Sequence, residues 1–407
     1  MPRQAALALM VMLSGAVTAS AAEAPAPDPQ QGDGRVSAFY TWQGAIPATP
    51  GKLLRQEPLD PVLGLPSAAA GIRILYSSTG GADAKSPVAV SGLVFLPTGT
   101  PPAGGWPLFV WAHETAGMAD VCAPSWSGYS TRVEAFLDAW LEQGFAIVAT
   151  DYEGLGTPGP NPYTVVLPEA YDVLDSIRAA QQGFTALGKK IVLAGYSQGA
   201  GAALAAAALQ PTYAPGLDIR GTVATGMPYL TPETVGHLRD SDPNRPDATL
   251  IYALYIGRMA QQREPGLKAA DMFGEAALPL FDLTRRACVF QVYLEVLSDG
   301  VTRAQSVKPA YTEALMRLLP ALEYPTLKLP QPIFIGIGAN DRDTPAALQR
   351  ALAKDACVAG TTVEAHVYLD ARHDTAVTRS LPDALPFVKK VMAGETVAPA
   401  CSPEPEY

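Results

Sequence analysis

A serine flanked by glycines is the first sign of chemistry in this chain of 407 residues. Residues 195–199 read G-Y-S-Q-G, the pattern G-x-S-x-G, after the apolar run IVLA and before a run rich in alanine. In this context the pattern predicts a sharp turn from a strand into a helix, which presents Ser197 as a nucleophile. The backbone N–H of Gln198 would stabilise the oxyanion that forms during attack. The alternative, a glycine-rich helix start with an incidental serine, explains this context less well.

A serine is a weak nucleophile until a base removes its proton, and the base needs an acid to orient it. In this strand–helix architecture the chain order is Ser, then Asp or Glu, then His. Three histidines follow Ser197. His237 precedes any suitable acid loop, His366 lies inside a strand pattern, and His373 lies in the loop LDARHDTAV after the last strand. We therefore expect His373 to be the base.

The acid is expected in the segment ANDRDTP, which follows the apolar strand PIFIGIG. Catalytic loops collect at this carboxyl end of strands in α/β proteins. The segment offers Asp341 and Asp343. Because Asp343 stands just before Thr344 and Pro345, we expect it to serve the N-terminus of the next helix. Asp341 is therefore the preferred acid.

The loop after the strand LFVWAH is expected to supply the second oxyanion donor, through the backbone N–H of Thr115. Within this loop His113 and Glu114 begin like the zinc motif H-E-x-x-H, but position 117 is glycine, which excludes that motif. Three residues beside the proposed catalytic groups are expected to contact the substrate: His113, Glu114 and Tyr196. Two residues of the segment after the sixth predicted strand, Tyr229 and Leu230, are expected to do the same.

The composition excludes several classes of function. A net charge of −10 provides no basic face for nucleic acid. Four histidines and four cysteines leave few ligands for a metal site. Glycines 154, 156 and 159 match a dinucleotide-binding pattern, but nearby prolines prevent the helix which that site needs. We expect no metal and no organic cofactor.

The elements that must position these residues alternate between strands and helices, which predicts an α/β fold with a mostly parallel central sheet flanked by helices. Nearly continuous apolar runs indicate strands covered on both faces. The predicted strands are Ile72–Ser77, Val88–Leu96, Leu108–Ala112, Phe145–Thr150, Ile191–Ala194, Gly221–Thr225, Ile333–Ile337 and Val363–Tyr368. The predicted helices are Thr131–Glu142, Pro168–Leu187, Gln198–Leu209, Pro345–Lys354 and Pro382–Met392.

About a hundred residues separate the sixth predicted strand from the seventh, far more than an ordinary connection. Amphipathic stretches such as Ala253–Gln261 and Val289–Leu297 indicate an inserted helical cap. The expected domains are core 35–227, cap 228–328 and core 329–407. Further cap residues that could line a substrate pocket, or form ordinary cap core, are Tyr252, Tyr255, Met259 and Phe273.

The first residues predict export. Arg3, an apolar run to about Val17 and small residues after it are typical of a secretory signal peptide over residues 1–22, cleaved near Ala21 or Ala22. Residues 23–34 read as a flexible leader. The protein is therefore expected to be secreted or periplasmic, with two disulfides. Its four cysteines, Cys122, Cys288, Cys357 and Cys401, allow three pairings.

Several segments together resemble the secretory lipase family of α/β-hydrolases over residues 70–395: AHETAGMADVCAPSW, DYEGLGTP, YDVLDSIRAAQ, GYSQGA, DRDTP and ARHDT. The resemblance implies an α/β-hydrolase fold with a helical cap between the sixth and seventh core strands. It also implies Ser197 as nucleophile, Asp341 as acid and His373 as base. Disulfides Cys122–Cys288 and Cys357–Cys401 would fit the family. Many relatives have glycine where this chain has Glu114.

The predicted function is that of a secreted lipase or esterase, which hydrolyses acylglycerols or other lipid-like esters through an acyl-enzyme on Ser197. Alternatives on the same triad are a polyester or plant-wall ester esterase, a peptidase, and an acyltransferase that uses an alcohol in place of water. A non-catalytic binding module is disfavoured by the complete Ser, Asp and His set. We expect no nucleic-acid partner and no membrane span, while transient contact with a lipid interface stays open.

Overall fold

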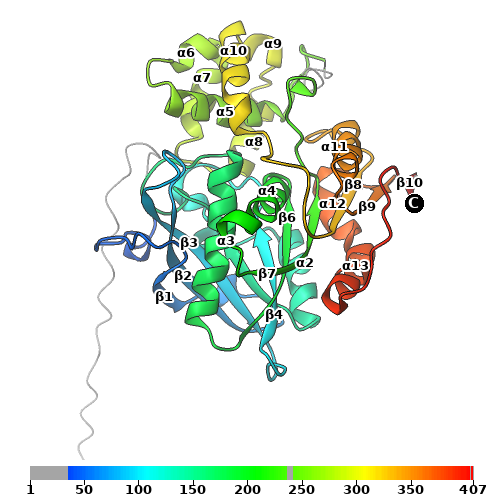
Figure 1. Cartoon of the computed structure of the whole chain (residues 1–407). Coiled ribbons are helices and arrows are strands. Elements are labelled where there is room, and N and C mark those ends of the chain that lie inside the picture. The colour runs from blue at the N-terminus through cyan, green and yellow to red at the C-terminus, as the bar shows by residue number, and fades with distance from the viewer. Residues whose placement is uncertain (1–34, 236–241, 404, 407) are drawn as a thin grey trace, which may run out of the picture.

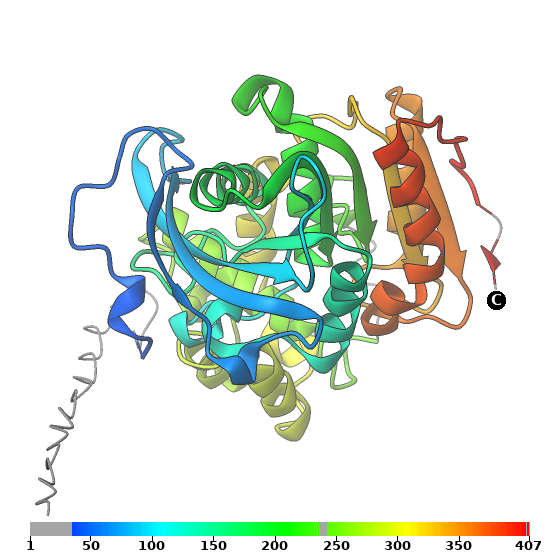
Figure 2. The same ribbon diagram turned by 90° about the horizontal axis from the view of Figure 1, so that it is seen from below.

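The computed structural model describes residues 35–235, 242–403 and 405–406. The predicted signal peptide and leader, and His237, lie outside the described residues. Ten strands form one sheet in the order β1-β2-β3-β5-β4-β6-β7-β8-β9-β10 (Figures 1 and 2). The pairs among β1, β2, β3 and β5 are antiparallel, and all later pairs are parallel. The strands are β1 Leu53–Pro58, β2 Ala68–Thr79, β3 Pro87–Pro97, β4 Trp106–Ala112, β5 Ala146–Thr150, β6 Leu187–Tyr196, β7 Asp218–Thr225, β8 Ile333–Gly338, β9 Val363–Tyr368 and β10 Pro405–Glu406.

Helices cover both faces of the sheet, because successive strand side chains point in opposite directions. In β4, Leu108 and Val110 pack into one apolar cluster with helices α3 and α4, whereas Phe109 and Trp111 pack into another with α2 and α13. Figure 2 shows helices on the two sides of the twisted sheet. The helices of this core are α1 Pro124–Ser127, α2 Thr131–Glu142, α3 Val166–Gly183, α4 Gln198–Tyr213, α11 Ala346–Val358, α12 His373–Arg379 and α13 Leu381–Ala393.

A helical cap is inserted between β7 and β8, which contain the sixth and seventh strands expected from the sequence. It stands above the sheet in Figure 1. The cap has an apolar core of its own, around Leu254, Tyr255 and Phe273. Its helices are α5 Leu250–Arg263, α6 Ala269–Met272, α7 Leu278–Leu283, α8 Val289–Ser298, α9 Arg303–Ser306 and α10 Pro309–Leu318. The expected α/β-hydrolase architecture with a cap is therefore present.

Several elements differ from the expectation; α12, for example, begins at His373, which the sequence places in a loop. β1 was missed because this edge strand, LLRQEP, is only half-buried and carries polar side chains. β6 begins at Leu187, where the sequence predicts the end of a helix, and α3 ends earlier, at Gly183. α4 continues beyond Pro211 to Tyr213. Proline lacks the N–H that would donate to the carbonyl four residues earlier, so at this position α4 loses one hydrogen bond of its last turn.

Two disulfides join distant segments of the chain, Cys122 to Cys288 and Cys357 to Cys401. These are the pairs that the family resemblance implies. The first links the core to the cap, since Cys288 immediately precedes α8. No helix among the described residues combines the length and the apolar character that a membrane span requires.

Candidate active site

Ser197 sits at the turn between β6 and α4 with φ 55° and ψ −124°. This backbone conformation is unfavourable for a residue with a side chain. The turn is held because the Ser197 N–H donates to the Thr225 carbonyl at 2.9 Å. Glycine is required on both sides of it. A Cβ on Gly195 would lie 2.0 Å from the Gly199 carbonyl oxygen, and one on Gly199 would lie 1.9 Å from that of Ala112.

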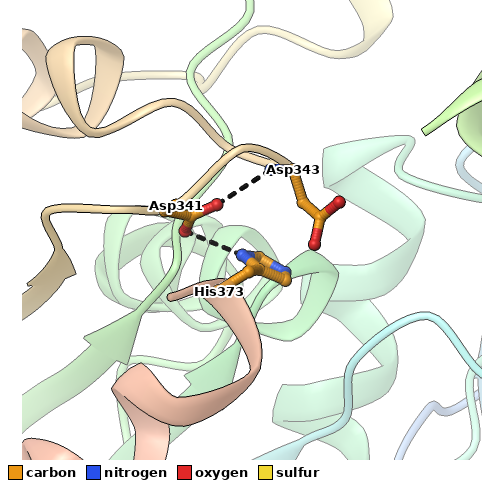
Figure 3. A group of neighbouring side chains, drawn as sticks. All are labelled: Asp341, Asp343 and His373. Atoms are coloured by element: carbon orange, nitrogen blue, oxygen red, sulfur yellow. Dashed lines mark hydrogen bonds and ion pairs between the residues drawn. The ribbon is translucent and has the colours of Figure 1, made fainter. Parts of the chain in front are cut away.

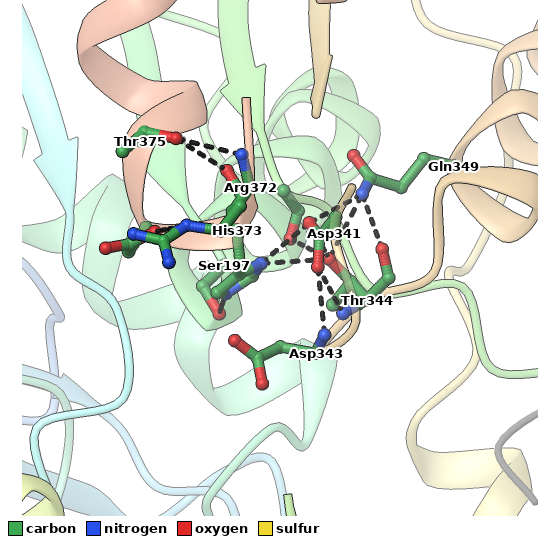
Figure 4. A network of polar contacts seen from close by, with 10 residues as sticks. Ser197, Asp341, Asp343, Thr344, Gln349, Arg372, His373 and Thr375 are labelled. Carbon is green, nitrogen blue, oxygen red and sulfur yellow. Dashed lines mark hydrogen bonds and ion pairs between the residues drawn. The ribbon is translucent and has the colours of Figure 1, made fainter. Parts of the chain in front are cut away.

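The side chains of Ser197, His373 and Asp341 form a continuous chain of contacts (Figure 4). His373 Nε2 lies 2.8 Å from Ser197 Oγ, and His373 Nδ1 lies 2.8 Å from Asp341 Oδ2. With the Nδ1–H donating to the carboxylate, Nε2 is free to accept the serine proton. Ser197 and His373 are only 7% and 6% exposed, so bulk water is largely kept from the pair.

Two loops at the carboxyl ends of β8 and β9 bring the acid and the histidine together. The Asn340 N–H donates to the Ala371 carbonyl at 2.9 Å and ties one loop to the other. Asp341 Oδ1 accepts from the backbone N–H groups of Asp343 and Thr344 at 3.0 and 2.9 Å. Gln349 Nε2 on α11 donates to Oδ2 at 2.9 Å. These donors fix the Asp341 carboxylate in its orientation toward His373.

The electrostatic surroundings of His373 favour its protonated form. Burial lowers its pKa, but the hydrogen bond and negative charge of Asp341, with the charges of Asp343 and Asp374, outweigh burial. The pKa of His373 is therefore raised above the ordinary value of 6.5. A raised pKa suits a group that takes up a proton during a reaction and later returns it.

Asp343 does not have the role that the sequence suggested. The N-cap of α11 is Pro345, and no side chain caps that helix end. Instead, the Asp343 carboxyl lies close to His373, as Figure 3 shows. One ligand atom from each of Asp341, Asp343 and His373 falls within 4.8 Å of the others, and His373 Nδ1 is engaged by Asp341 Oδ2. Burial raises the pKa of the Asp343 carboxyl.

The two residues expected to form the oxyanion hole have buried partners. Thr115 Oγ1 lies 2.8 Å from the Tyr163 hydroxyl. Gln198 begins α4, and its Nε2 donates to Glu169 Oε1 on α3 at 2.6 Å. Burial raises the pKa of Glu169 to about 8. The buried Glu169 carboxyl thus accepts a hydrogen bond from the residue that follows the serine.

Three of the expected substrate contacts lie around the triad. The Tyr196 ring packs against the His373 ring at a centroid distance of 5.0 Å. His113 is buried, and its ring nitrogens face the backbone carbonyls of Glu114 and Asp151. Glu114 Oε2 is buried without a hydrogen-bond partner, and burial raises the pKa of this carboxyl.

The expected cap contacts are mostly placed elsewhere. The Tyr229 hydroxyl donates to Asp355 Oδ2 of α11 at 2.9 Å. Leu230 lines a pocket of about 20 Å³ together with Gln198 and Glu169. Three other candidates belong to the apolar core of the cap: Tyr255, Met259 and Phe273. For them the interpretation as ordinary core is the correct one.

Sequence reasoning missed four residues that hold the site: Tyr163, Glu169, Thr344 and Gln349. Thr344 Oγ1 lies 2.9 Å from Asp341 Oδ2 and 3.2 Å from His373 Nδ1. A hydroxyl residue three positions after a loop aspartate can donate to that carboxylate, so the spacing of Thr344 from Asp341 could have indicated its role. Glu169 and Gln349 lie within helices, where a polar residue usually faces solvent, so no local pattern marks them.

Comparison with known proteins places this geometry in a family. The model of the secretory lipase family matches residues 123–399. Lipase A of Moesziomyces aphidis is 27% identical over 390 residues, which cover 89% of this chain and 81% of that protein. Lipase 7 of Candida albicans is 38% identical over 123 residues, but this match spans only 28% of that lipase and 27% of this chain.

The fold is shared with a solved structure. Candida antarctica lipase A in its closed state superposes with a TM-score of 0.72 at 22% identity, covering 91% of this chain and 89% of that one. At this identity the likeness establishes the fold alone. Because the family match extends over more than half of the residues, the chain belongs to the secretory lipase family.

Proposed function

We propose that this protein is a secreted serine carboxylic-ester hydrolase that acts on acylglycerols or other lipid-like esters. The observation that carries the proposal is the unbroken contact from Ser197 Oγ through the His373 ring to the Asp341 carboxylate. Relatives that are named lipases support this reaction class and the lipid-like substrate.

In the proposed mechanism, His373 Nε2 takes the proton of Ser197 while Oγ bonds to the ester carbonyl carbon. The backbone N–H groups of Thr115 and Gln198 stabilise the negative oxygen. The intermediate collapses, the C–O bond to the alcohol breaks, and His373 gives its proton to the departing alkoxide. Water then repeats the sequence on the acyl-enzyme and releases the acid. Asp341 keeps the imidazole oriented and stabilises its charged form.

The remaining expectations about the whole chain are part of the same proposal. Residues 228–328 would form a cap domain over a core made of 35–227 and 329–407, and the cap would select the acyl chain. The signal peptide would be removed near Ala21 or Ala22. The two disulfides and the membership in a secretory family support export.

The test is hydrolysis of p-nitrophenyl esters from acetate to palmitate by the wild type and by Ser197→Ala. We expect activity in the wild type and a loss of roughly 10⁴-fold or more in the variant. His366→Gln is a matched control for His373→Gln, because His366 lies within β9 and stacks on Phe334 of β8, outside the chain of contacts that joins Ser197, His373 and Asp341. An active Ser197→Ala variant would exclude the proposed nucleophile, and an inactive wild type would exclude simple esters as substrates.

A further inference from the structure

Helix α8 exposes an apolar face on the cap. Val292 and Val296 point into the apolar core of the cap. The opposite face follows the spacing i, i+3, i+4, i+7 of a single helix side. We call these four residues the α8 stripe: Phe290, 69% exposed, Tyr293, 40%, Leu294, 48%, and Leu297, 42%.

The α8 stripe is unusual for this protein. Among the described residues eight large apolar side chains are exposed, and four of them lie on this one helix. Only one of the ten residues of α8, Glu295, is charged, and it is half-buried. By contrast, the outer face of α10 in the same cap carries Glu313 and Arg317. A gathered apolar patch of this kind marks a contact surface rather than ordinary scatter.

The stripe is fixed beside the candidate active site. Cys288, directly before α8, is bonded to Cys122 and pairs with Gly117 in a short antiparallel bridge. The Val289 N–H donates to the Ala116 carbonyl at 2.8 Å. The first turn of α8 is therefore attached to the loop that contains Thr115. Figure 1 shows α8 at the base of the cap, next to the core.

We propose that the α8 stripe docks the protein on the surface of a neutral lipid aggregate and so brings the active site to its ester substrate. This inference rests on the proposed function. Apolar side chains that project from an anchored helix are suited to entering the acyl region of an interface. A net charge of −10 and the lack of basic residues on α8 favour a neutral surface over an anionic one.

A second copy of the chain fits the stripe less well. A stable dimer buries about 800 Å² on each partner, contributed by about 20–30 residues. Four side chains on a ten-residue helix form a much smaller surface. The attachment of α8 to the loop of Thr115 also favours lipid, because a lipid surface bound by the stripe would hold the ester substrate close to the active site.

Docking can be measured without turnover by using the full chain with Ser197→Ala and vesicles of phosphatidylcholine containing triolein. We expect this Ser197→Ala protein to sediment with the vesicles. Adding Phe290→Ser and Leu294→Ser to it should lower the partition coefficient between water and vesicles by roughly tenfold for each side chain. The matched control is Val62→Ser with Val358→Ser, because both valines are 81% exposed and lie on other elements. This control should partition like its parent. Adding phosphatidylglycerol to the vesicles should weaken binding.

The same two double substitutions, made in the protein that keeps Ser197, separate docking from chemistry. Loss of the α8 stripe should slow hydrolysis of a triolein emulsion by at least roughly tenfold and leave hydrolysis of dissolved p-nitrophenyl acetate unchanged. Equal partition by the stripe variant and the control would overturn the proposal. So would a wild-type dimer in sedimentation velocity that the stripe variant converts to a monomer. If the wild type hydrolysed no ester while vesicle binding still depended on the stripe, the proposed function would fail and the docking surface would stand.

Discussion

At the scale of single residues, the orientation of His373 depends mainly on Asp341. We expect the wild-type kcat/KM to rise with pH, since the base must be neutral. The midpoint of this rising limb should lie above the ordinary histidine pKa of 6.5, because the pKa of His373 is raised. Asp341→Asn removes the charge and the proper hydrogen bond. This change should lower kcat by roughly 10³–10⁴-fold and move the limb to lower pH.

Asp343→Asn is the matched control for that experiment. Asp343 adds negative charge near His373, but no hydrogen bond to the ring accompanies it. We expect only a small shift of the limb to lower pH, with kcat largely kept. Profiles of kcat/KM against pH for the three proteins provide the measurement. A larger loss in Asp343→Asn than in Asp341→Asn would reverse the assignment of the acid.

Glu169 should make the protein less stable at high pH. Its pKa is raised from 4.5 to about 8, because burial disfavours the carboxylate. The protonated Glu169 carboxyl makes its full contribution to the unfolding free energy below pH 4.5, the pKa of this group in the unfolded chain. This contribution is lost as the pH rises to about 8, the pKa in the folded protein. Relative to Glu169→Gln, the wild type should therefore lose about 4 kcal/mol of unfolding free energy across this range. Urea titrations from pH 5 to 8 measure the difference, and parallel curves for the two proteins would contradict a buried, protonated Glu169.

Much of the candidate site could be predicted from the sequence, because motif and chain order restrict the choices. Three histidines follow Ser197, and the structure places only His373, of the two it describes, against the serine. Gln349 and Glu169 could not be found in this way. Their partners come from other elements, so their role exists only once the chain has folded.

At the scale of elements, the sequence predicts the central strands well and the edge strand poorly. Central strands such as β5 and β8 are buried on both faces, so nearly every residue is apolar and the pattern is strong. β1 pairs with β2 at the sheet edge and keeps polar residues, so its sequence resembles a loop. Cap helices follow a clear amphipathic pattern, but their order in space depends on long-range contacts that no local pattern contains.

The start of α4 allows a sharp test of the turn at Ser197. In Gly199→Ala the new Cβ would meet the Ala112 carbonyl oxygen, which belongs to the central strand β4 and cannot shift. We expect a loss of about 3 kcal/mol in unfolding free energy and of most activity. Gly201→Ala on the same helix is the control. Its Cβ would lie 3.1 Å from the Tyr324 hydroxyl, a side-chain atom that would need to move by only a few tenths of an ångström, and alanine favours helix, so stability should change by less than about 1 kcal/mol. Similar losses in both variants would show that the helix, not the turn, is sensitive.

At the scale of the whole molecule, the Cys122–Cys288 disulfide couples the cap to the core. It closes a sequence separation of 166 residues and fixes α8 to the loop of Thr115. Replacing both cysteines with serine should lower the free energy of unfolding by about 2–4 kcal/mol, because the unfolded chain regains freedom. It should also lower kcat on dissolved esters, since the loop that carries the proposed oxyanion donor loses its anchor.

The second disulfide provides the comparison that separates stability from catalysis. Cys357–Cys401 joins α11 to the C-terminal segment, where Ala400 pairs with Glu364 of β9, so it links two parts of the core and does not include the cap. Its removal should also cost about 2–4 kcal/mol, but kcat at low temperature should stay near that of the wild type. Thermal unfolding and ester kinetics on both double variants test this. If the two double variants lost the same unfolding free energy and the same fraction of kcat, the Cys122–Cys288 disulfide would contribute only to stability. The idea that the cap holds the loop of Thr115 in place would then be wrong.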